Sequence, residues 1–314
     1  MLMINAFFNH KKILWQEADF YGAANLIFDI RNKPIVYRAS WMHGMGYSFS
    51  GINHPDNFIH PDEISLPNHY VNNKESVLFL KNNNINSKAI GMPFVYTFDS
   101  FPSFSERYID NLFIPEHDIS SPQEYKFKNF LSLCKKYKCD GLLLSKNDFI
   151  RAKKIKFNFE DIKIFCGADI TNPSALQDLS ELLQSTKSVY SDVFGSHIYY
   201  ALSSGCNLYL VDEIMKNYTS DKRKIRKKSI QKSISKSFKQ KVNSNYFPLE
   251  ELLGGIWGSS SMTEKKEYSD YMIGLDMKLP REDLISGFTP RSFKEKYNII
   301  KKLTYKKISR KLSI

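Results

Sequence analysis

Between residues 110 and 213, short aliphatic runs alternate with longer stretches in which apolar residues recur every three or four positions. An aliphatic run that ends in polar residues is typical of a buried parallel strand, whereas the second pattern is typical of an amphipathic helix. Regular alternation of the two predicts a mainly parallel sheet covered by helices. The predicted strands are 112–115, 140–144, 162–166, 188–190 and 207–211, and the predicted helices are 123–137, 174–185 and 196–203.

The N-terminal third of the chain shows a less regular version of the same pattern. The elements that it predicts are a helical region at 11–33, strands at 34–39, near Tyr70 and at 88–91, and a helix at 74–82 with Asn73 as its cap. The loop-like stretch 97–108 then separates the two parts of the chain. We therefore predict an α/β protein with two domains, 1–105 and 106–290, followed by a basic helical segment at 291–314.

The stretch 188–213 is predicted to form a strand, a polar loop, a helix and a second strand. Asp192 is the expected helix cap, Gly195-Ser196-His197 forms the first turn, and Ser204-Gly205 is a stop signal. The loop before the helix follows the carboxyl end of a strand, which is where α/β sheets bind ligands.

The start of this helix offers backbone N–H groups, the Ser196 hydroxyl and the His197 ring to a ligand. A helix N-terminus binds anions, because its first N–H groups are unpaired and carry partial positive charge. The stretch therefore suits a diphosphate or a phosphodiester. The alternative is an ordinary connection between a strand and a capped helix, since short Gly-Ser loops are common in α/β folds.

A second glycine-containing turn, Trp41-Met42-His43-Gly44-Met45-Gly46, follows the predicted strand at 34–39. Glycines such as Gly44 and Gly46 let the backbone approach a bound group closely. His43 is therefore a candidate for binding or deprotonating a hydroxyl group, because a histidine accepts a proton near neutral pH. The alternative is a histidine whose hydrogen bonds serve the structure alone.

Two further polar loops carry ionisable residues. Glu116, His117 and Asp118 follow the predicted strand at 112–115, so we expect them at the carboxyl edge of the sheet. The loop at 50–69 contains three histidines and several acids, but no pair has the i,i+4 helical spacing of a common zinc site. We predict no metal site.

The chain of 314 residues is long enough for two domains, and its 42% of hydrophobic residues allow sizeable cores. Its net charge of +12 is concentrated in two segments. Residues 216–241 contain eleven Lys or Arg and one acid, and residues 291–314 contain nine and one, so the rest of the chain is mildly acidic. This distribution favours a basic face or tail over a nucleic-acid-binding fold, and we predict no nucleic-acid partner.

Both basic segments, 216–241 and 291–314, have a thin apolar stripe at roughly helical spacing. In the second segment the stripe consists of Phe293, Tyr297, Ile300, Ile308 and Leu312. A basic helix of this kind docks on an anionic membrane surface. The alternative is a solvated helix whose stripe packs on the body of the protein.

The four cysteines lack CxxC spacing and are typical of reduced cytoplasmic thiols. The N-terminus lacks the residue order of a signal peptide, and no uncharged apolar run reaches the roughly 18–20 residues of a membrane span. We therefore expect a cytoplasmic protein, held at the inner face of the cytoplasmic membrane by its basic segments.

Four motifs of the chain resemble those of bacterial surface-polysaccharide glycosyltransferases, of the capsule or O-antigen type, whose two Rossmann-like domains form the GT-B arrangement. The motifs are the Trp41–Gly44 turn (W-x-H-G), Lys88–Pro93 at the exit from the first domain, Leu112–His117 at the opening of the donor domain, and Phe194–His197 with Ala201 and Gly205 in the donor-side helix. Related enzymes that use CMP-activated acidic sugars often carry a His-Pro pair where this chain has Ser145–Asp148, so the donor sugar stays open.

The resemblance implies two Rossmann-like domains that face across a cleft, and transfer of a sugar from a nucleotide-sugar to a hydroxyl of a polysaccharide or lipid-linked glycan. The implied donor-binding residues are His117, Gly195, Ser196, His197, Asp212 and Glu213. His43 would be the acceptor-side base, with Glu116 or Asp118 as alternatives, and Gly44 and Gly46 would form the acceptor loop. No cofactor or metal is implied, because the helix dipole and fixed hydrogen-bond donors meet the charge of the leaving phosphate.

Two other classes of function remain open. A nucleotide-sugar epimerase-like enzyme with the same cleft would turn over a nucleotide-sugar when no acceptor is present. A non-catalytic nucleotide-sugar-binding protein of the polysaccharide pathway would bind the nucleotide-sugar without any turnover.

Overall fold

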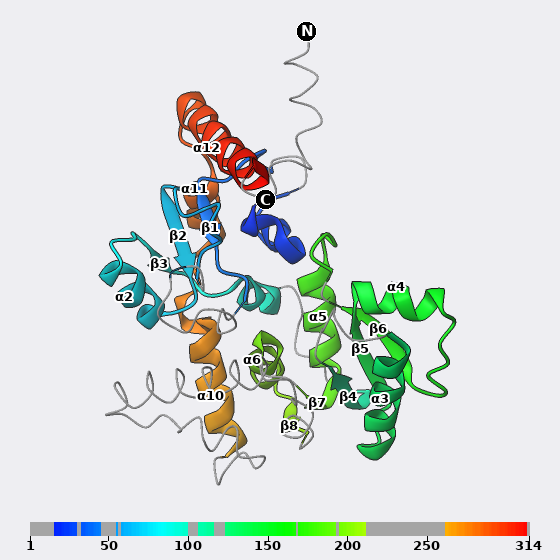
Figure 1. Cartoon of the computed structure of the whole chain (residues 1–314). Coiled ribbons are helices and arrows are strands. Elements are labelled where there is room, and N and C mark those ends of the chain that lie inside the picture. The colour runs from blue at the N-terminus through cyan, green and yellow to red at the C-terminus, as the bar shows by residue number, and fades with distance from the viewer. Residues whose placement is uncertain are drawn as a thin grey trace.

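The computed structural model describes residues 16–29, 33–44, 55, 58–99, 106–115, 123–167, 169–192, 195–211 and 261–312. These residues form a mixed α/β protein with two parallel sheets (Figure 1). One sheet has the strand order β1-β2-β3, and the other has the order β6-β5-β4-β7-β8. The prediction of an α/β fold with mainly parallel strands is confirmed.

The larger sheet comes from a regular alternation of strands and helices. Its elements are β4 (Ile109–Ile114), α3 (Gln123–Lys136), β5 (Gly141–Ser145), α4 (Lys146–Lys154), β6 (Lys163–Gly167), α5 (Ala175–Gln184), β7 (Thr186–Ser191), α6 (Ser196–Ser203) and β8 (Asn207–Leu210). Every strand is parallel to its neighbours. After β6 the chain returns to pair β7 with β4, and such a reversal of strand order is the point where doubly wound sheets bind ligands.

Side chains of the larger sheet alternate between two hydrophobic cores, as the two-residue period of a strand requires. Leu142 and Leu144 of β5 pack with Phe127 of α3 in one core, whereas Leu143 belongs to the other. The second core also contains the buried side of α6, including Ile198. The helices therefore cover both faces of the sheet, with α3 and α6 in different cores.

The smaller sheet consists of β1 (Ala39–Trp41), β2 (Asn68–Val71) and β3 (Lys88–Ala89). The prediction of a strand at 34–39 is wrong, because only its last residue belongs to β1. The backbone N–H groups of Tyr37 and Arg38 donate to the Gln16 side chain and to the Phe288 carbonyl instead of a neighbouring strand. A buried backbone N–H needs one partner, and here the tertiary fold supplies it.

Helix α2 (Lys74–Asn82) has the predicted bounds. The Asn73 side chain accepts a hydrogen bond from the Ser76 N–H at 3.1 Å, so the predicted cap is also confirmed.

In the region predicted to be helical at 11–33, the described residues form the 3₁₀ helix η2 (Glu17–Leu26), which is kinked at residues 20–22. Gly22 has φ +80°, and a Cβ there would lie 2.0 Å from the Pro173 carbonyl oxygen. Tyr21 N–H also donates to the Ile170 carbonyl at 3.2 Å. Gly22 therefore packs closely on the loop that follows β6 and joins η2 to it.

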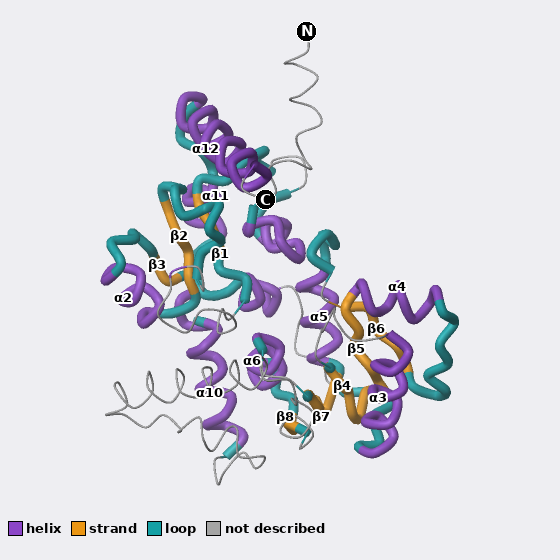
Figure 2. The backbone as a smooth tube through the Cα atoms, in the orientation of Figure 1, coloured by secondary structure: helices purple, strands orange, loops and turns teal. Residues whose placement is uncertain are grey.

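The C-terminal helices lead the chain back to the smaller sheet (Figure 2). They are α10 (Met262–Ile273), the short η5 (Leu275–Met277), α11 (Arg281–Phe288) and α12 (Phe293–Leu312). Phe288 of α11 packs against Trp41, and α12 buries Ile299 and Leu303 against Val36. The predicted C-terminal basic helix is therefore present, and one side of it packs on the protein.

One hydrophobic core takes residues from both sheets. Trp41, Phe94, Val189 and Tyr200 all belong to it. Phe94, in the 3₁₀ helix η4 (Pro93–Asp99), stacks on Tyr200 of α6 with ring centroids 4.0 Å apart. The smaller sheet thus shares a core with α6, the helix that follows β7, and η4 packs directly on that helix.

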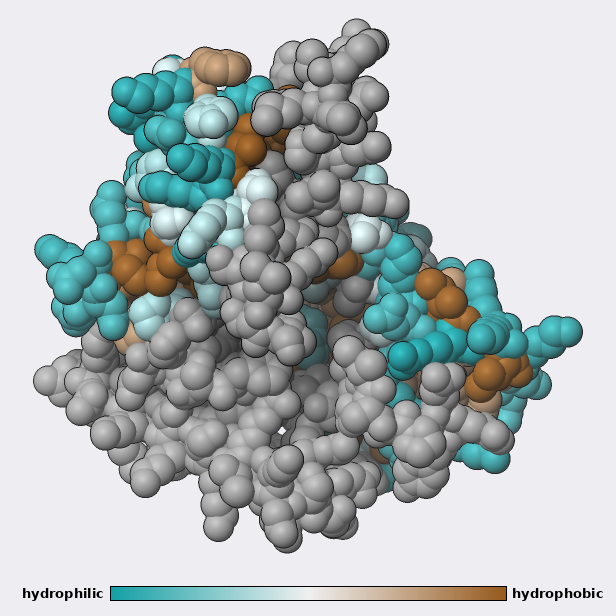
Figure 3. Space-filling model, turned by 45° about the horizontal axis from the view of Figure 1, so that its top comes forward, coloured by the Kyte–Doolittle hydropathy of each residue, from teal (hydrophilic) through white to brown (hydrophobic). Residues whose placement is uncertain are grey.

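On the face seen in Figure 3, the described residues are mostly hydrophilic, with separate hydrophobic patches between them. Within the described part of the chain, no helix combines the length and the apolar character needed to cross a membrane.

Candidate functional site

The first part of the candidate site lies at the carboxyl ends of β4 and β7. Ser191, the last residue of β7, donates a hydrogen bond from its hydroxyl to the Ile114 carbonyl at the end of β4, at 2.8 Å. The same Oγ lies 2.9 Å from Nε2 of His197, in the first turn of α6. His197 is therefore fixed to the switch point of the larger sheet.

These two contacts of Ser191 indicate which nitrogen of the His197 ring carries the proton. A hydroxyl has one proton, and Ser191 donates it to the Ile114 carbonyl. Ser191 Oγ therefore accepts a hydrogen bond, and Nε2 of His197 carries the proton that it accepts. In the neutral ring, Nδ1 is then the nitrogen with the lone pair.

Gly195 occupies the N-cap position of α6, and no side chain caps the helix there. The prediction of Asp192 as the cap is wrong, because the helix begins three residues later than that cap requires. A Cβ at Gly195 would lie 3.0 Å from Nδ1 of His197 and 3.2 Å from Cε1. The glycine thus leaves room for the His197 ring beside the helix start.

The second part of the candidate site is the Trp41–Gly44 turn, which follows β1 of the smaller sheet. Tyr200 of α6 donates a hydrogen bond from its hydroxyl to the His43 carbonyl at 3.1 Å, and Ser196 is hydrogen-bonded to the same hydroxyl. A Cβ at Gly44 would lie 3.5 Å from the Ser196 Oγ. The structure therefore brings the predicted acceptor-side turn and the predicted donor-side helix start into contact.

The His43 ring lies between aromatic and acidic side chains of η2. Its centroid is 4.9 Å from that of Phe20 and 5.6 Å from that of Tyr21. Its Nδ1 lies 3.6 Å from Oε1 of Glu17. Burial, together with the nearby charge of His60, lowers the pKa of His43 to about 4, so the ring is neutral at pH 7.

Glu17 and Glu63 are the ionisable residues near His43 that sequence reasoning missed. Both are buried, and the Glu17 N–H donates to Oε1 of Glu63 at 2.5 Å. Burial raises the pKa of Glu17 to about 8, and burial together with the Glu17 charge raises the pKa of Glu63 well above its usual range. Their sequence context gives no signal, because glutamates in polar stretches are normally exposed.

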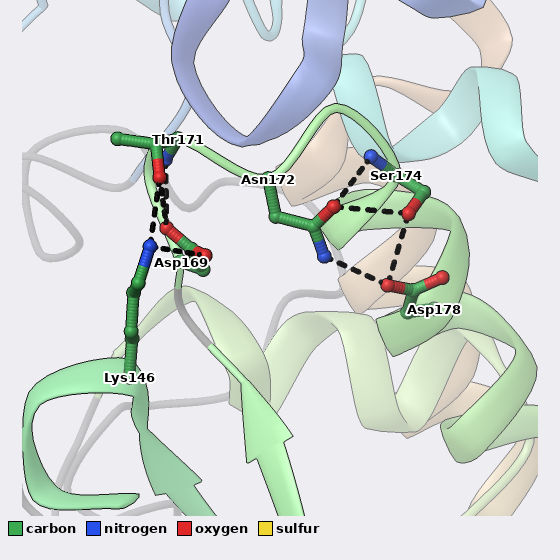
Figure 4. A network of polar contacts seen from close by, with 6 residues as sticks. All are labelled: Lys146, Asp169, Thr171, Asn172, Ser174 and Asp178. Atoms are coloured by element: carbon green, nitrogen blue, oxygen red, sulfur yellow. Dashed lines mark hydrogen bonds and ion pairs between the residues drawn. The ribbon is translucent and has the colours of Figure 1, made fainter. Parts of the chain in front are cut away.

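The carboxyl ends of β5 and β6 carry a separate polar network (Figure 4). Lys146 pairs with Asp169 at 2.8 Å and donates to the Thr171 hydroxyl, and Asn172 and Ser174 both hydrogen-bond to Asp178. Each of these side chains has a protein partner, so the network orders the loop between β6 and α5.

The segment Ser145–Asp148, where the chain departs from the resembled enzymes, begins α4. Ser145 caps the helix by accepting from the Asp148 N–H, and Asp148 forms a buried ion pair with Lys126 at 2.9 Å. These contacts give the segment a structural role.

Several predicted site residues lie outside the described part of the chain. They are Gly46, Glu116, His117, Asp118, Asp212 and Glu213. The described residues Pro115 and Val211 immediately precede two of these segments. Among the residues that the structure describes, no group of three or more His, Cys, Asp or Glu side chains is arranged to hold a metal ion.

Comparisons of the chain with family models, curated proteins and solved structures found no match. The functional interpretation therefore depends on the chain's own residues and geometry.

Proposed function

We propose that the protein is a glycosyltransferase that moves a sugar from a nucleotide-sugar to a hydroxyl group of a surface-polysaccharide or lipid-linked glycan. The nucleotide diphosphate or phosphate of the donor binds at the start of α6, with the sugar directed toward the Trp41–Gly44 turn. Two Rossmann-like domains in a GT-B arrangement would form the cleft for this reaction.

One observation carries the proposal: the start of α6 lies at the switch point of a parallel sheet and touches a histidine-containing turn from the other sheet. Ser196 and His197 are half-buried, so they are held in position without being enclosed in a core. An anion-binding helix start beside a candidate base is the arrangement that group transfer from a nucleotide-sugar needs.

In the proposed reaction, the acceptor hydroxyl attacks the anomeric carbon while the bond from that carbon to the donor phosphate breaks. His43 takes the hydroxyl proton in the form of its neutral ring that has a nitrogen lone pair free toward the acceptor. The phosphate leaves with the bonding electrons and gains negative charge. The backbone N–H groups of the first turn of α6 stabilise that charge. The Ser196 hydroxyl joins them by turning from Tyr200 to the phosphate, and His197 joins them when its Nδ1 gains a proton and can donate.

The donor assignment is tested by thermal unfolding of the full chain with UDP-, GDP-, dTDP- and CMP-sugars. A ligand at 100 times its Kd stabilises a protein by about 2.7 kcal/mol, which gives a clear rise in Tm. We expect one nucleotide class to raise Tm in the wild type and to lose this effect in His197→Ala. Lys187→Ala, an exposed change at the amino end of β7, is the matched control and keeps the shift.

No shift with any nucleotide-sugar, or an equal shift in His197→Ala, contradicts the donor site. Turnover of the bound nucleotide-sugar without an acceptor would identify an epimerase-like activity. Binding without turnover, with or without an acceptor, would identify a non-catalytic nucleotide-sugar-binding protein.

We also propose that the outer face of α12 holds the enzyme at an anionic membrane surface, beside its lipid-linked acceptor. Phe293, Tyr297 and Tyr305 are 81%, 54% and 73% exposed, and they follow one another at intervals of four and eight residues. These intervals put the three rings on one side of a helix. Exposed aromatic rings among lysines are typical of helices that bind anionic lipid.

A further inference from the structure

Three ionisable side chains lie together at the Trp41–Gly44 turn. Glu17 begins η2, Glu63 lies in the turn that precedes β2, and His43 follows β1. Three buried atoms among them have no hydrogen-bond partner: Oε2 of Glu17, Oε2 of Glu63 and Nδ1 of His43. Unpaired buried polar atoms destabilise a folded protein, so the stability of the fold does not explain why these three side chains are buried together.

The Glu17 carboxyl is held in place on two sides. The backbone N–H of Glu17 donates to Oε1 of Glu63 at 2.5 Å, and the Glu17 carboxyl is hydrogen-bonded to the backbone of His60. From this position Oε1 of Glu17 lies 3.6 Å from Nδ1 of His43. That distance is too long for a formed hydrogen bond, but catalytic hydrogen bonds often tighten when a ligand binds.

The surroundings of Glu17 favour its protonated form. Burial raises the pKa of Glu17, and the charges of Glu17, Asp19 and Asp62 add to burial in raising the pKa of Glu63. Within the described residues no Lys or Arg forms an ion pair with either carboxyl. The remaining ionisable neighbour, His60, faces Asp62, with Nδ1 and Oδ2 3.7 Å apart. Because burial raises the pKa of Glu17 to about 8, the carboxyl holds its proton at pH 7.

We propose that Glu17 is a positioning residue that selects which nitrogen of the His43 ring carries the proton. This inference rests on the proposed role of His43 as the acceptor-side base. A protonated Glu17 donates to Nδ1, so the ring proton is on Nε2. An ionised Glu17 accepts from Nδ1–H, which leaves Nε2 with a lone pair that can take a proton from a hydroxyl.

The conversion balances in protons. The carboxyl proton of Glu17 passes to Nδ1 of His43, and the proton on Nε2 leaves to solvent or to a bound ligand. The ring stays neutral throughout, and the pair as a whole loses one proton. His43 thereby changes from a hydrogen-bond donor at Nε2 to a base at Nε2.

The test follows the ¹⁵N signals of the His43 ring by NMR in the full chain between pH 6 and 9.5, with His43→Ala to assign them. We expect the proton to move from Nε2 to Nδ1 with a midpoint near pH 8. His69, which is also buried and lies 2.9 Å from the Ser40 hydroxyl, is the internal control and keeps one tautomer across this range.

Two variants test the role of the carboxyl. Glu17→Gln has the shape of the protonated acid and cannot ionise, so His43 should keep one tautomer at every pH. Glu63→Gln keeps an oxygen that can accept from the Glu17 N–H, and burial is the cause that raises the pKa of Glu17, so the transition should persist with its midpoint still near pH 8. An unchanged tautomer in the wild type, or the same transition in Glu17→Gln, overturns the inference.

The NMR test of Glu17 can succeed or fail independently of the proposed function, because the signals are recorded without substrate. A tautomer change that is lost in Glu17→Gln, in a protein that transfers no sugar, supports the positioning role and contradicts the transferase. If transfer is observed, kcat/KM of the wild type should rise with pH through the same midpoint. In Glu17→Gln that rise should disappear.

Discussion

Gly195 begins α6 with φ −159° and ψ −178°, an extended conformation that any residue adopts. The need for glycine there comes from space, because a Cβ would lie 3.0 Å from Nδ1 and 3.2 Å from Cε1 of His197. The His197 ring would have to shift by a few tenths of an ångström, which disturbs its contact with Ser191. Gly44 differs, since its Cβ would be at an ordinary distance of 3.5 Å from the Ser196 Oγ.

We predict that Gly195→Ala weakens nucleotide-sugar binding at least tenfold while it changes Tm little. The measurement is a titration of the nucleotide-sugar that raises Tm, carried out on both proteins. Gly44→Ala is the matched control, and its affinity should stay within about threefold of the wild type. An affinity of Gly195→Ala equal to that of the wild type would mean that the His197 ring does not contact the donor.

The buried carboxyls near His43 give the protein an unusual dependence of stability on pH. The pKa of Glu17 is raised from 4.5 to about 8 in the folded state, so the folded protein binds more protons than the unfolded chain between these values. Stability contributed by Glu17 is therefore complete below about pH 4.5 and is lost as the pH rises to 8. His43 and His69, whose pKa values are lowered to about 4, act in the opposite direction, but only between pH 4 and 6.5.

Between pH 6.5 and 8 the two histidines no longer contribute to this dependence. We predict that the free energy of unfolding falls over this window in the wild type by up to about 2 kcal/mol for each of the two buried carboxyls, since each pH unit corresponds to about 1.4 kcal/mol for one proton. Urea unfolding at several pH values measures it. The fall should be smaller in Glu17→Gln, and a stability that rises over the window would contradict the assignment.

Among the elements, α3 offers a comparison between a buried and an exposed ion pair. Lys126 pairs with Asp148 of α4, and both side chains are less than a tenth exposed. Lys135, later in the same helix, pairs with Glu160 at 2.7 Å, with both side chains about half exposed. Breaking a buried pair leaves an uncompensated charge, whereas an exposed pair is screened by water.

We predict that Lys126→Met lowers the free energy of unfolding by about 3–5 kcal/mol. Lys135→Met, the matched control in the same helix, should cost less than about 1 kcal/mol. Urea unfolding of the two variants measures both values. Restored stability in the double variant Lys126→Met/Asp148→Leu would identify the buried carboxylate left without its lysine as the cause, and equal costs for the two single variants would contradict the assignment.

At the scale of the whole molecule, α12 packs on the protein with one face and exposes the other. Ile299 and Leu303 are buried against the smaller sheet, and Glu295 pairs with Arg38 at 3.2 Å. Phe293 and Tyr305 are on the exposed side. Of the two interpretations of the basic helix, packing on the protein is therefore correct for one face, and membrane docking is a proposal for the other.

We predict that replacing Phe293, Tyr297 and Tyr305 together by serine reduces binding to vesicles that contain anionic lipid at least tenfold. The change removes exposed apolar area and leaves the buried face intact, so Tm and nucleotide-sugar binding should be unchanged. Leu78→Ser, an exposed change on α2, is the control. Equal vesicle binding by the triple variant would contradict docking through this face.

All the strands of the larger sheet and three of its helices were predictable because each has a local signal, whereas α4 was not predicted. Aliphatic runs mark its strands, and Gly205 ends α6 with φ +79°, a conformation that favours glycine. The strand predicted at 34–39 failed because its N–H groups have partners far away in the sequence. The burial of Glu17 could not be predicted for the same reason, because its partners His60 and Glu63 lie 43 and 46 positions away in the sequence.

The sequence by itself determined the alternation of strands and helices, the glycine-bounded helix at 196–203 and the basic C-terminal helix, because these depend on neighbours a few positions apart. Only the tertiary structure decided that the Trp41–Gly44 turn meets Ser196, that Glu17 lies beside His43, and which face of α12 is buried. Those contacts join segments more than 250 residues apart in the case of α12 and Val36, and they depend on how the two sheets pack on one core. No local pattern encodes that packing.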